Sequence, residues 1–228
     1  MKLPSLVLLG WLAGAALPAL ANDVSPEELE RWFNSDSMDP PRYTQVNDGH
    51  LQFLARAPKE NLHHHHNALT IFPSSLQDGW IGIQQCHTNL DRVPAAQVLF
   101  NKDRVRDIRI VSYENMEKAW VEDASVQMTN ITANARLCIQ ASSRALIRNV
   151  DGSFSLRNGP FMRRFLDGYY PIRVSLDLDF ATTDLQLVNI TPAPQTGFAV
   201  RQGDGSVHVD ALFEGKLQTE FRFRIKKL

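Results

Sequence analysis

Short segments of alternating polarity are the feature that most constrains how this chain folds. From Ile172 to Phe180 every second residue is apolar, and the residues between them are polar or charged. A period of two places one set of side chains on each face of a strand, so this segment predicts a half-buried β-strand. The pattern recurs in Leu185 to Ile190, Val207 to Phe213 and Phe221 to Ile225. Gly203-Asp204-Gly205 supplies a turn, and an antiparallel meander is the simplest assembly.

Similar short segments, separated by Asp, Asn, Gly and Pro, occupy the part of the chain before this region. They are His50 to Ala55, Ala68 to Phe72, Trp80 to Cys86, Gln97 to Asn101, Val105 to Tyr113, Ala119 to Glu122, Ser125 to Ile131 and Ala135 to Ala141. Such spacing favours a sandwich or barrel over alternating β-α units. We therefore predict an all-β fold, an antiparallel β-sandwich of one large unit or two packed immunoglobulin-like units, with a short N-terminal helix.

The first 21 residues predict a secretory signal peptide. Lys2 supplies the positive charge, Leu6 to Leu20 the apolar run, and Ala19-Leu20-Ala21 the small residues that precede cleavage before Asn22. The apolar run is shorter than the roughly 20 residues of a membrane-spanning helix. The sequence therefore predicts an exported, periplasmic protein with no transmembrane segment in the mature chain.

The mature chain divides into three predicted parts. Residues 22–44 hold a helix and a linker, because Ser25-Pro26-Glu27-Glu28 has a cap, a proline at the first helical position and acidic residues in the first turn. The helix ends at Phe33, and Pro40-Pro41 belongs to the linker. Residues 45–150 form a β-rich region with a disulfide, and residues 151–228 form a C-terminal antiparallel β region.

Charge and motifs exclude several classes of function. The formal net charge is −1, which gives no basis for binding nucleic acid as a main partner. The chain has no glycine-rich phosphate loop and no dinucleotide fingerprint, and its serines lack the G-x-S-x-G context of a hydrolase nucleophile. We therefore expect no nucleic-acid partner and no enzyme of these classes.

The two cysteines, Cys86 and Cys138, predict one disulfide. An oxidising compartment favours a bridge, and closing a loop of about 50 residues would stabilise the fold by roughly 4 kcal/mol on the chain-entropy model. Two alternatives stay open on the sequence alone. The cysteines could be free thiols, or Cys86 could serve as a soft ligand for copper(I).

Four consecutive histidines, His63 to His66, and the nearby His87 are the clearest candidates for chemistry. Imidazole is the commonest protein ligand for transition metals, and short histidine-rich tracts often bind them. No complete signature spacing of a zinc, iron or copper site accompanies the run. The alternative interpretation is a solvated strand end whose histidines only titrate.

The strand pattern allows the histidine run to be placed in three dimensions. Ala68 to Phe72 and Trp80 to Cys86 should form a hairpin, and pairing Leu69 with Ile83, and Ile71 with Ile81, puts the apolar side chains on one face. The same register extended along the strands sets His65 opposite His87. His63 lies two residues from His65 and shares its face, so three imidazoles could converge on one copper or zinc ion.

Two further segments yield predictions. In the predicted meander, Asp177 and Asp179 would face Arg222 and Arg224 in a solvated charge ladder.

Between the β regions, residues 158–170 contain Phe161 and Phe165 one helical turn apart, which favours a short helix at the end of the sandwich. The alternative for this segment is a basic, aromatic lip that contacts a partner or lipid. His50 and His208 are isolated and are expected to be structural or exposed.

Three functional hypotheses follow. The first is a non-enzymatic exported β protein that binds copper or zinc at His63, His65 and His87, for trafficking, buffering or sensing. The second is a periplasmic interaction or assembly module for an envelope protein partner, in which the histidines are incidental and a sheet edge or the segment Phe161 to Tyr170 binds the partner. The third is a metal-dependent hydrolase, which is disfavoured because no convincing general base accompanies the histidines.

Overall fold

The structure is a computed structural model that describes residues 47–58 and 61–226. The predicted signal peptide and N-terminal helix lie outside these residues. The described residues belong to one compact unit that spans Arg42–Leu228. Strands dominate this unit, and the helix α2 (Ser75–Asp78) is a single turn. The prediction of an all-β sandwich is confirmed.

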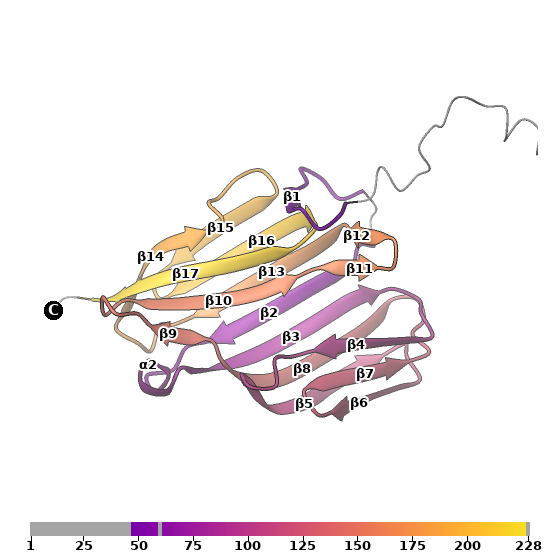
Figure 1. The fold of residues 1–228 in the computed structure, drawn as a ribbon, viewed down its shortest axis with the longest axis horizontal. Helices are drawn as coiled ribbons and strands as arrows, with labels where there is room; N and C mark the ends of the chain where they lie inside the picture. The colour runs from indigo at the N-terminus through magenta and orange to yellow at the C-terminus, as the bar shows by residue number, and fades with distance from the viewer. Residues whose placement is uncertain (1–46, 59–60, 227–228) are drawn as a thin grey trace, which may run out of the picture. The chain divides into compact units, whose positions relative to one another are not determined.

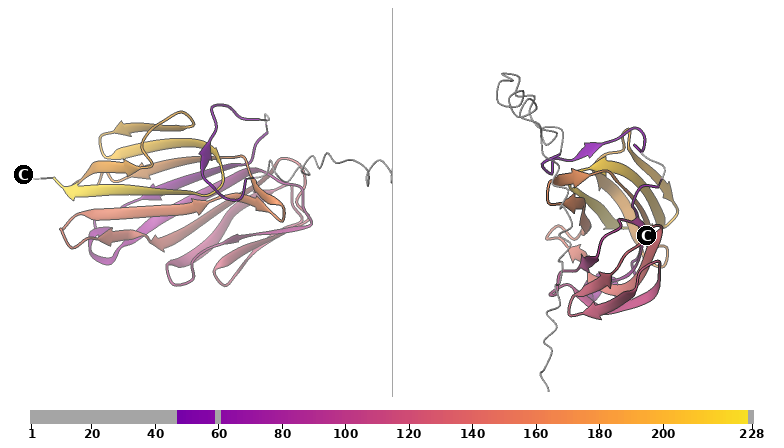
Figure 2. Two further views of the ribbon diagram at one scale, coloured as in Figure 1. Left: turned by 45° about the horizontal axis from the view of Figure 1, so that its top comes forward. Right: turned by 90° about the vertical axis from the view of Figure 1, so that its right-hand side faces the viewer.

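A large mixed sheet forms the body of the unit (Figure 1). Its eight strands are β1 (Gln52–Phe53), β2 (His64–Thr70), β3 (Trp80–Leu90), β5 (Val105–Glu114), β8 (Ala135–Arg144), β13 (Ile172–Asp179), β15 (Phe198–Gly203) and β16 (Ser206–Glu214). Neighbouring strands follow the order β1-β16-β13-β2-β3-β8-β5, and β15 pairs with β16. The end-on view in Figure 2 shows these strands following a curve. Strands from the predicted regions 45–150 and 151–228 therefore share one sheet.

Smaller sheets complete the sandwich. One contains β9 (Leu146–Arg148), β10 (Phe154–Phe161), β14 (Leu185–Thr191) and β17 (Leu217–Ile225). Another contains β4 (Ala95–Leu99), β6 (Lys118–Glu122) and β7 (Ser125–Thr129), and a hairpin pairs β11 (Arg163–Phe165) with β12 (Gly168–Tyr170). In Figure 1, β2 and β3 are visible between β10 of the first small sheet and β4 of the second.

Each small sheet covers its own part of the same face of the large sheet. The four-stranded sheet packs on β13, β16, β2 and β3, with fully buried Phe213, Phe221 and Phe223 at the centre of this core. The three-stranded sheet packs on β8 and β5 through Val126, Leu137 and their neighbours. Burial of apolar side chains drives both contacts, at about 1.5–3 kcal/mol for each large side chain. We call the covered side of the large sheet the inner face and the opposite side the outer face.

The hairpin register deduced from the apolar pattern is confirmed. β2 and β3 are antiparallel, with Leu69 opposite Ile83 and His65 opposite His87. The ladder ends at Thr70, one residue before the predicted pair of Ile71 and Ile81, although both of those side chains are buried. The turn at residues 203–205 also occurs as predicted, where Gly205 has a φ of 72° between β15 and β16.

The predicted meander and its charge ladder are wrong. β13 lies in the large sheet, between β16 and β2, whereas β17 lies in the four-stranded sheet. β13 pairs with β2 in parallel, which requires a long-range crossover. Asp177 consequently faces His66 and His208 on the outer face, and Arg222 is on another sheet.

The helix expected within residues 158–170 is also wrong. The segment continues β10 and then forms the β11–β12 hairpin. Phe161 is buried against the His65 ring, with centroids 5.0 Å apart, and Phe165 packs edge-on against Tyr170. Contacts with distant residues decided the structure here, because the i, i+4 spacing of two phenylalanines does not specify a helix by itself.

The predicted disulfide is present between Cys86 and Cys138. The two residues are directly opposite each other on β3 and β8, with Cα atoms 4.1 Å apart. Cys86 is paired with His66, so the bridge belongs to the outer face.

The part of the chain that the structure describes contains no helix with the length and apolar character needed to span a membrane.

Candidate functional site

The three histidines predicted to converge lie together on the inner face. Strand alternation directs His63 and His65 inward from the start of β2, and cross-strand pairing brings His87 of β3 alongside them. His63 Nε2 is 3.3 Å from His87 Nδ1, and the His65 and His87 rings stack with centroids 4.2 Å apart. The three side chains therefore lie together, as the predicted strand register requires.

Burial keeps two of these rings neutral. His65 and His87 are only 7% and 6% exposed. Desolvation, followed by repulsion from His87 and the other histidines of the run, holds the pKa of His65 well below its usual value. Desolvation, followed by repulsion from His63, lowers the pKa of His87 to about 3. At neutral pH each ring therefore keeps a nitrogen lone pair, which is the form that binds metals.

One ring nitrogen of His87 has no hydrogen-bond partner within residues 47–58 and 61–226. Its Nδ1 contacts His63, but its buried Nε2 has no hydrogen-bond partner in the described residues. A neutral imidazole carries one donor and one acceptor nitrogen. If Nδ1 donates to His63, then Nε2 presents an unused lone pair, and in the other tautomer it presents an unused N–H.

The distance between the ring nitrogens of His63 and His87 fits a tetrahedral metal centre. Two nitrogen ligands about 2.0–2.1 Å from a tetrahedral ion are about 3.3–3.4 Å apart, which matches the contact between His63 and His87. The third ring is not yet aligned, because His65 Nε2 is 3.0 Å from the Gln85 side-chain nitrogen. Among residues 47–58 and 61–226, no three His, Cys, Asp or Glu side chains converge on one metal position. The contact between His63 and His87 thus has the spacing of two ligands of one ion, whereas His65 is directed at Gln85.

The histidines lie at one end of a long cavity of about 810 Å³, which we call the inner groove. Its floor is the inner face of β2 and β3, and it is bordered by β4 on one side and by β10 and β11 on the other. Asn67, Gln85 and Asn158 add polar groups to the groove. Sequence reasoning missed these residues, although Asn67 and Gln85 occupy inward positions of their strands, where polar side chains are unusual.

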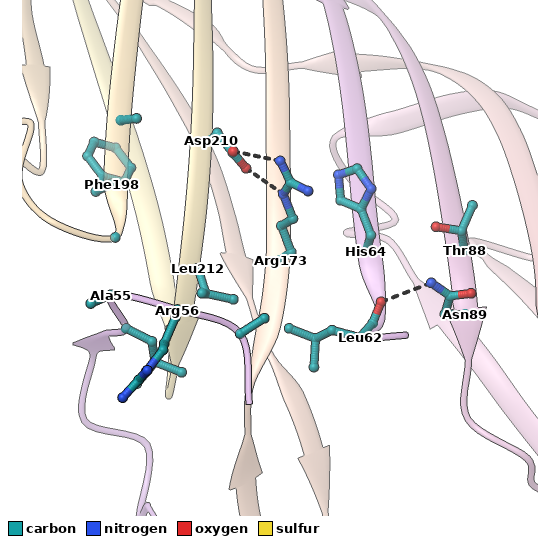
Figure 3. Close-up of a pocket in the computed structure, with 14 residues that line it drawn as sticks. Ala55, Arg56, Leu62, His64, Thr88, Asn89, Arg173, Phe198, Asp210 and Leu212 are labelled. Carbon is teal, nitrogen blue, oxygen red and sulfur yellow. Dashed lines mark hydrogen bonds and ion pairs between the residues drawn. The ribbon is translucent and has the colours of Figure 1, made fainter. Parts of the chain in front are cut away.

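The other two histidines of the run lie on the outer face. His64 Nε2 is 2.7 Å from the Ser175 hydroxyl, and Figure 3 shows the ring beside Arg173, which forms an ion pair with Asp210. Desolvation and then the Arg173 charge lower the pKa of His64. His64, Arg173 and Asp210 line a separate hollow of about 470 Å³. The four consecutive histidines thus divide between two faces and do not act as one cluster.

Asp177 joins three strands of the outer face. Its carboxylate accepts hydrogen bonds from His66 at 2.7 Å and from His208 at 2.6 Å. Partial burial opposes ionisation, but the bonds from His208 and His66 outweigh it and lower the pKa of Asp177. His208, expected to be isolated, therefore has a defined partner.

We expect the metal-free protein to lose stability as the pH falls from 7 to 5. The pKa of buried His87 is depressed, so the unfolded chain gains a proton below about pH 6.5 that the folded chain does not bind. Each such histidine lowers the free energy of unfolding by up to about 1.4 kcal/mol per pH unit. Replacing His87 with glutamine should reduce this slope, as measured by urea denaturation in EDTA. Identical slopes in the two proteins would show that His87 is protonated in the fold.

Scans of protein-family models and a search of curated protein sequences found no match. Among solved structures, an M1 zinc metallopeptidase from Deinococcus radiodurans, in a mutant form bound to a Tyr-Ser-Ala substrate, aligns at a TM-score of 0.37 and 10% identity. That alignment covers 72% of this chain and 42% of the peptidase. A further structure of an M1 zinc metallopeptidase from Deinococcus radiodurans aligns at a TM-score of 0.37 and 11% identity, over 78% of this chain and 43% of the peptidase. The chain thus spans less than half the length of these peptidases.

Proposed function

We propose that this protein binds a transition-metal ion, copper or zinc, in the periplasm, for trafficking, buffering or sensing. His63 and His87 would be the first two ligands and His65 the third. The observation that carries the proposal is the 3.3 Å contact between His63 Nε2 and His87 Nδ1, which matches one edge of a tetrahedral site.

The surroundings of the pair support this assignment. His87 is buried and held neutral, so a metal would not meet an imidazolium ion at pH 7. The proton of the N–H···N contact between His63 and His87 would move to the other nitrogen of its ring when the metal binds. The stacked ring of His65 can supply a third nitrogen when its contact with Gln85 is given up. A fourth position would be open to a water molecule or a cargo ligand from the inner groove. Imidazole nitrogens suit both zinc and copper, so the donor set does not choose between them.

The test is the metal content of untagged protein purified from the periplasm without a nickel column. We expect one equivalent of copper or zinc by elemental analysis, or one binding event in calorimetric titration of EDTA-treated protein. Protein that is isolated metal-free and gives no saturable binding heat with either ion would reject the proposal. Hydrolysis of a test substrate that appears only with bound metal would favour the hydrolase hypothesis instead.

A further inference from the structure

The four buried side-chain atoms that lack a hydrogen-bond partner in the described residues all belong to residues of the inner groove. They are Asn67 Oδ1, Gln85 Oε1, His87 Nε2 and Asn158 Nδ2. Leaving a buried polar group unpaired is unfavourable, so such groups are usually satisfied. Their concentration at one cavity points to an occupant that both donates and accepts hydrogen bonds.

The walls of the groove are strand edges. On the floor, alternate residues of β2 and β3 face the cavity, as expected for a sheet face. On the walls, consecutive residues 96–99 of β4 and 156–161 of β10 line it, together with the residues that follow each strand. Successive side chains of a strand point to opposite faces, so a cavity that meets consecutive residues meets the edge of the strand. In the described part of the chain, β4 pairs only with β7, and β10 beyond Leu156 pairs only with β17.

The exposed backbone groups can be identified from the neighbouring hydrogen bonds. Phe100 N donates to Ala124 O, and Asn130 N donates to Pro94 O. Because bonded positions alternate along an antiparallel strand, the even-numbered residues of β4 bond to β7, and the N–H of Gln97 points away from it. Two such edges flanking one floor form a site where an added strand can pair, as in β-augmentation.

The charges around the groove indicate what kind of strand fits. Of the residues that the structure describes, four arginines and one acidic residue, Asp91, line it. Ion pairs join Arg163 to Asp91 and Arg157 to Glu220, but in the described residues none joins Arg104 or Arg164 to a carboxylate. The rest of the lining is largely apolar, including Leu69, Ile81 and Ile83 on the floor.

We propose that the inner groove binds an extended peptide segment of a partner protein, in which acidic and apolar residues alternate. The peptide backbone pairs with the edge of β4, apolar side chains contact the floor, and carboxylates reach Arg104 and Arg164. The amide and imidazole groups of the groove bond to backbone groups of the peptide that β4 leaves unpaired. This binding does not depend on a metal, so it stands or falls separately from the proposed metal site.

The probe is an eight-residue peptide of alternating glutamate and valine, blocked at both ends, titrated into the EDTA-treated mature protein by calorimetry. We expect saturable binding, and Gln97→Pro should weaken it about tenfold or more, because proline removes one outward N–H and places its ring in the groove. Gln97→Ala should leave affinity within about twofold. A lysine-valine peptide, or a glutamate-valine peptide with N-methylated backbone, should not bind.

The matched control is Val121→Pro. Val121 lies on β6, at the other edge of the same three-stranded sheet, and the two-residue turn at 123–124 makes Glu122 and Ser125 a bonded pair. The N–H of Val121 therefore also points outward, but away from the groove, and this variant should bind the peptide like the parent. The proposal would be overturned if both proline variants weakened binding equally or if the probe peptide did not bind. It would also be overturned if the groove bound a fatty acid, tested as dodecanoate, and not the peptide.

Discussion

Removal of the Cys86–Cys138 bridge should lower the free energy of unfolding by about 4 kcal/mol. The bridge spans 52 residues in sequence, and the chain-entropy model assigns roughly this value to a loop of that length. The two residues already face each other on adjacent strands, so the bridge mainly restricts the unfolded chain. Urea denaturation of the oxidised protein and of a Cys86→Ala, Cys138→Ala double variant measures the difference.

Reduction of the parent protein provides an independent measure. The reduced protein and the double variant should unfold at similar urea concentrations, since both lack the same constraint. A loss below about 1 kcal/mol would mean that the unfolded chain is already compact around β3 and β8, so that the bridge restricts little. Full alkylation of the native, unreduced protein would show that the cysteines are free, contrary to the structure.

The sequence was sufficient for local pairing and insufficient for long-range order. Alternation along β2 and β3 determines which residues share a face, and matching apolar faces then gave the pairing of His65 with His87. The same reasoning failed for Asp177, because alternation does not say which strand lies next to β13. Its neighbour is β2, about a hundred residues earlier in the chain, in parallel orientation.

The groove could be only partly predicted for a similar reason. Its floor histidines belong to one hairpin and were found from the sequence. Its walls come from β4 and β10, which belong to different small sheets, and no local pattern indicates that their edges border one cavity. Asn158 begins the segment in which a short helix was expected, yet it lies on β10 and its side chain accepts a hydrogen bond from Asn67 on the floor.

Replacing His87 with alanine is expected to weaken copper or zinc binding by more than a hundredfold. Loss of an outer-shell partner typically lowers metal affinity by 10- to 100-fold, and His87 is proposed as a direct ligand, so its loss should have a larger effect. His63→Ala should be equally damaging, since its Nε2 provides the other end of the 3.3 Å contact. His87→Gln keeps more of the buried volume and serves as a second variant if His87→Ala unfolds.

The matched controls lie in the same histidine run. His64 and His66 point to the outer face, so replacing both with alanine should leave metal affinity within about threefold, and His208→Ala should also have no effect. If the four consecutive histidines bound the metal as a simple polyhistidine tract, the results would be reversed. Removing His64 and His66 would then weaken binding, and removing His87, which lies outside the run, would not. Calorimetric titration decides between them. Equal affinities for His87→Ala and the parent would rule out the convergent inner site, and would leave peptide binding in the groove as the function that the geometry supports.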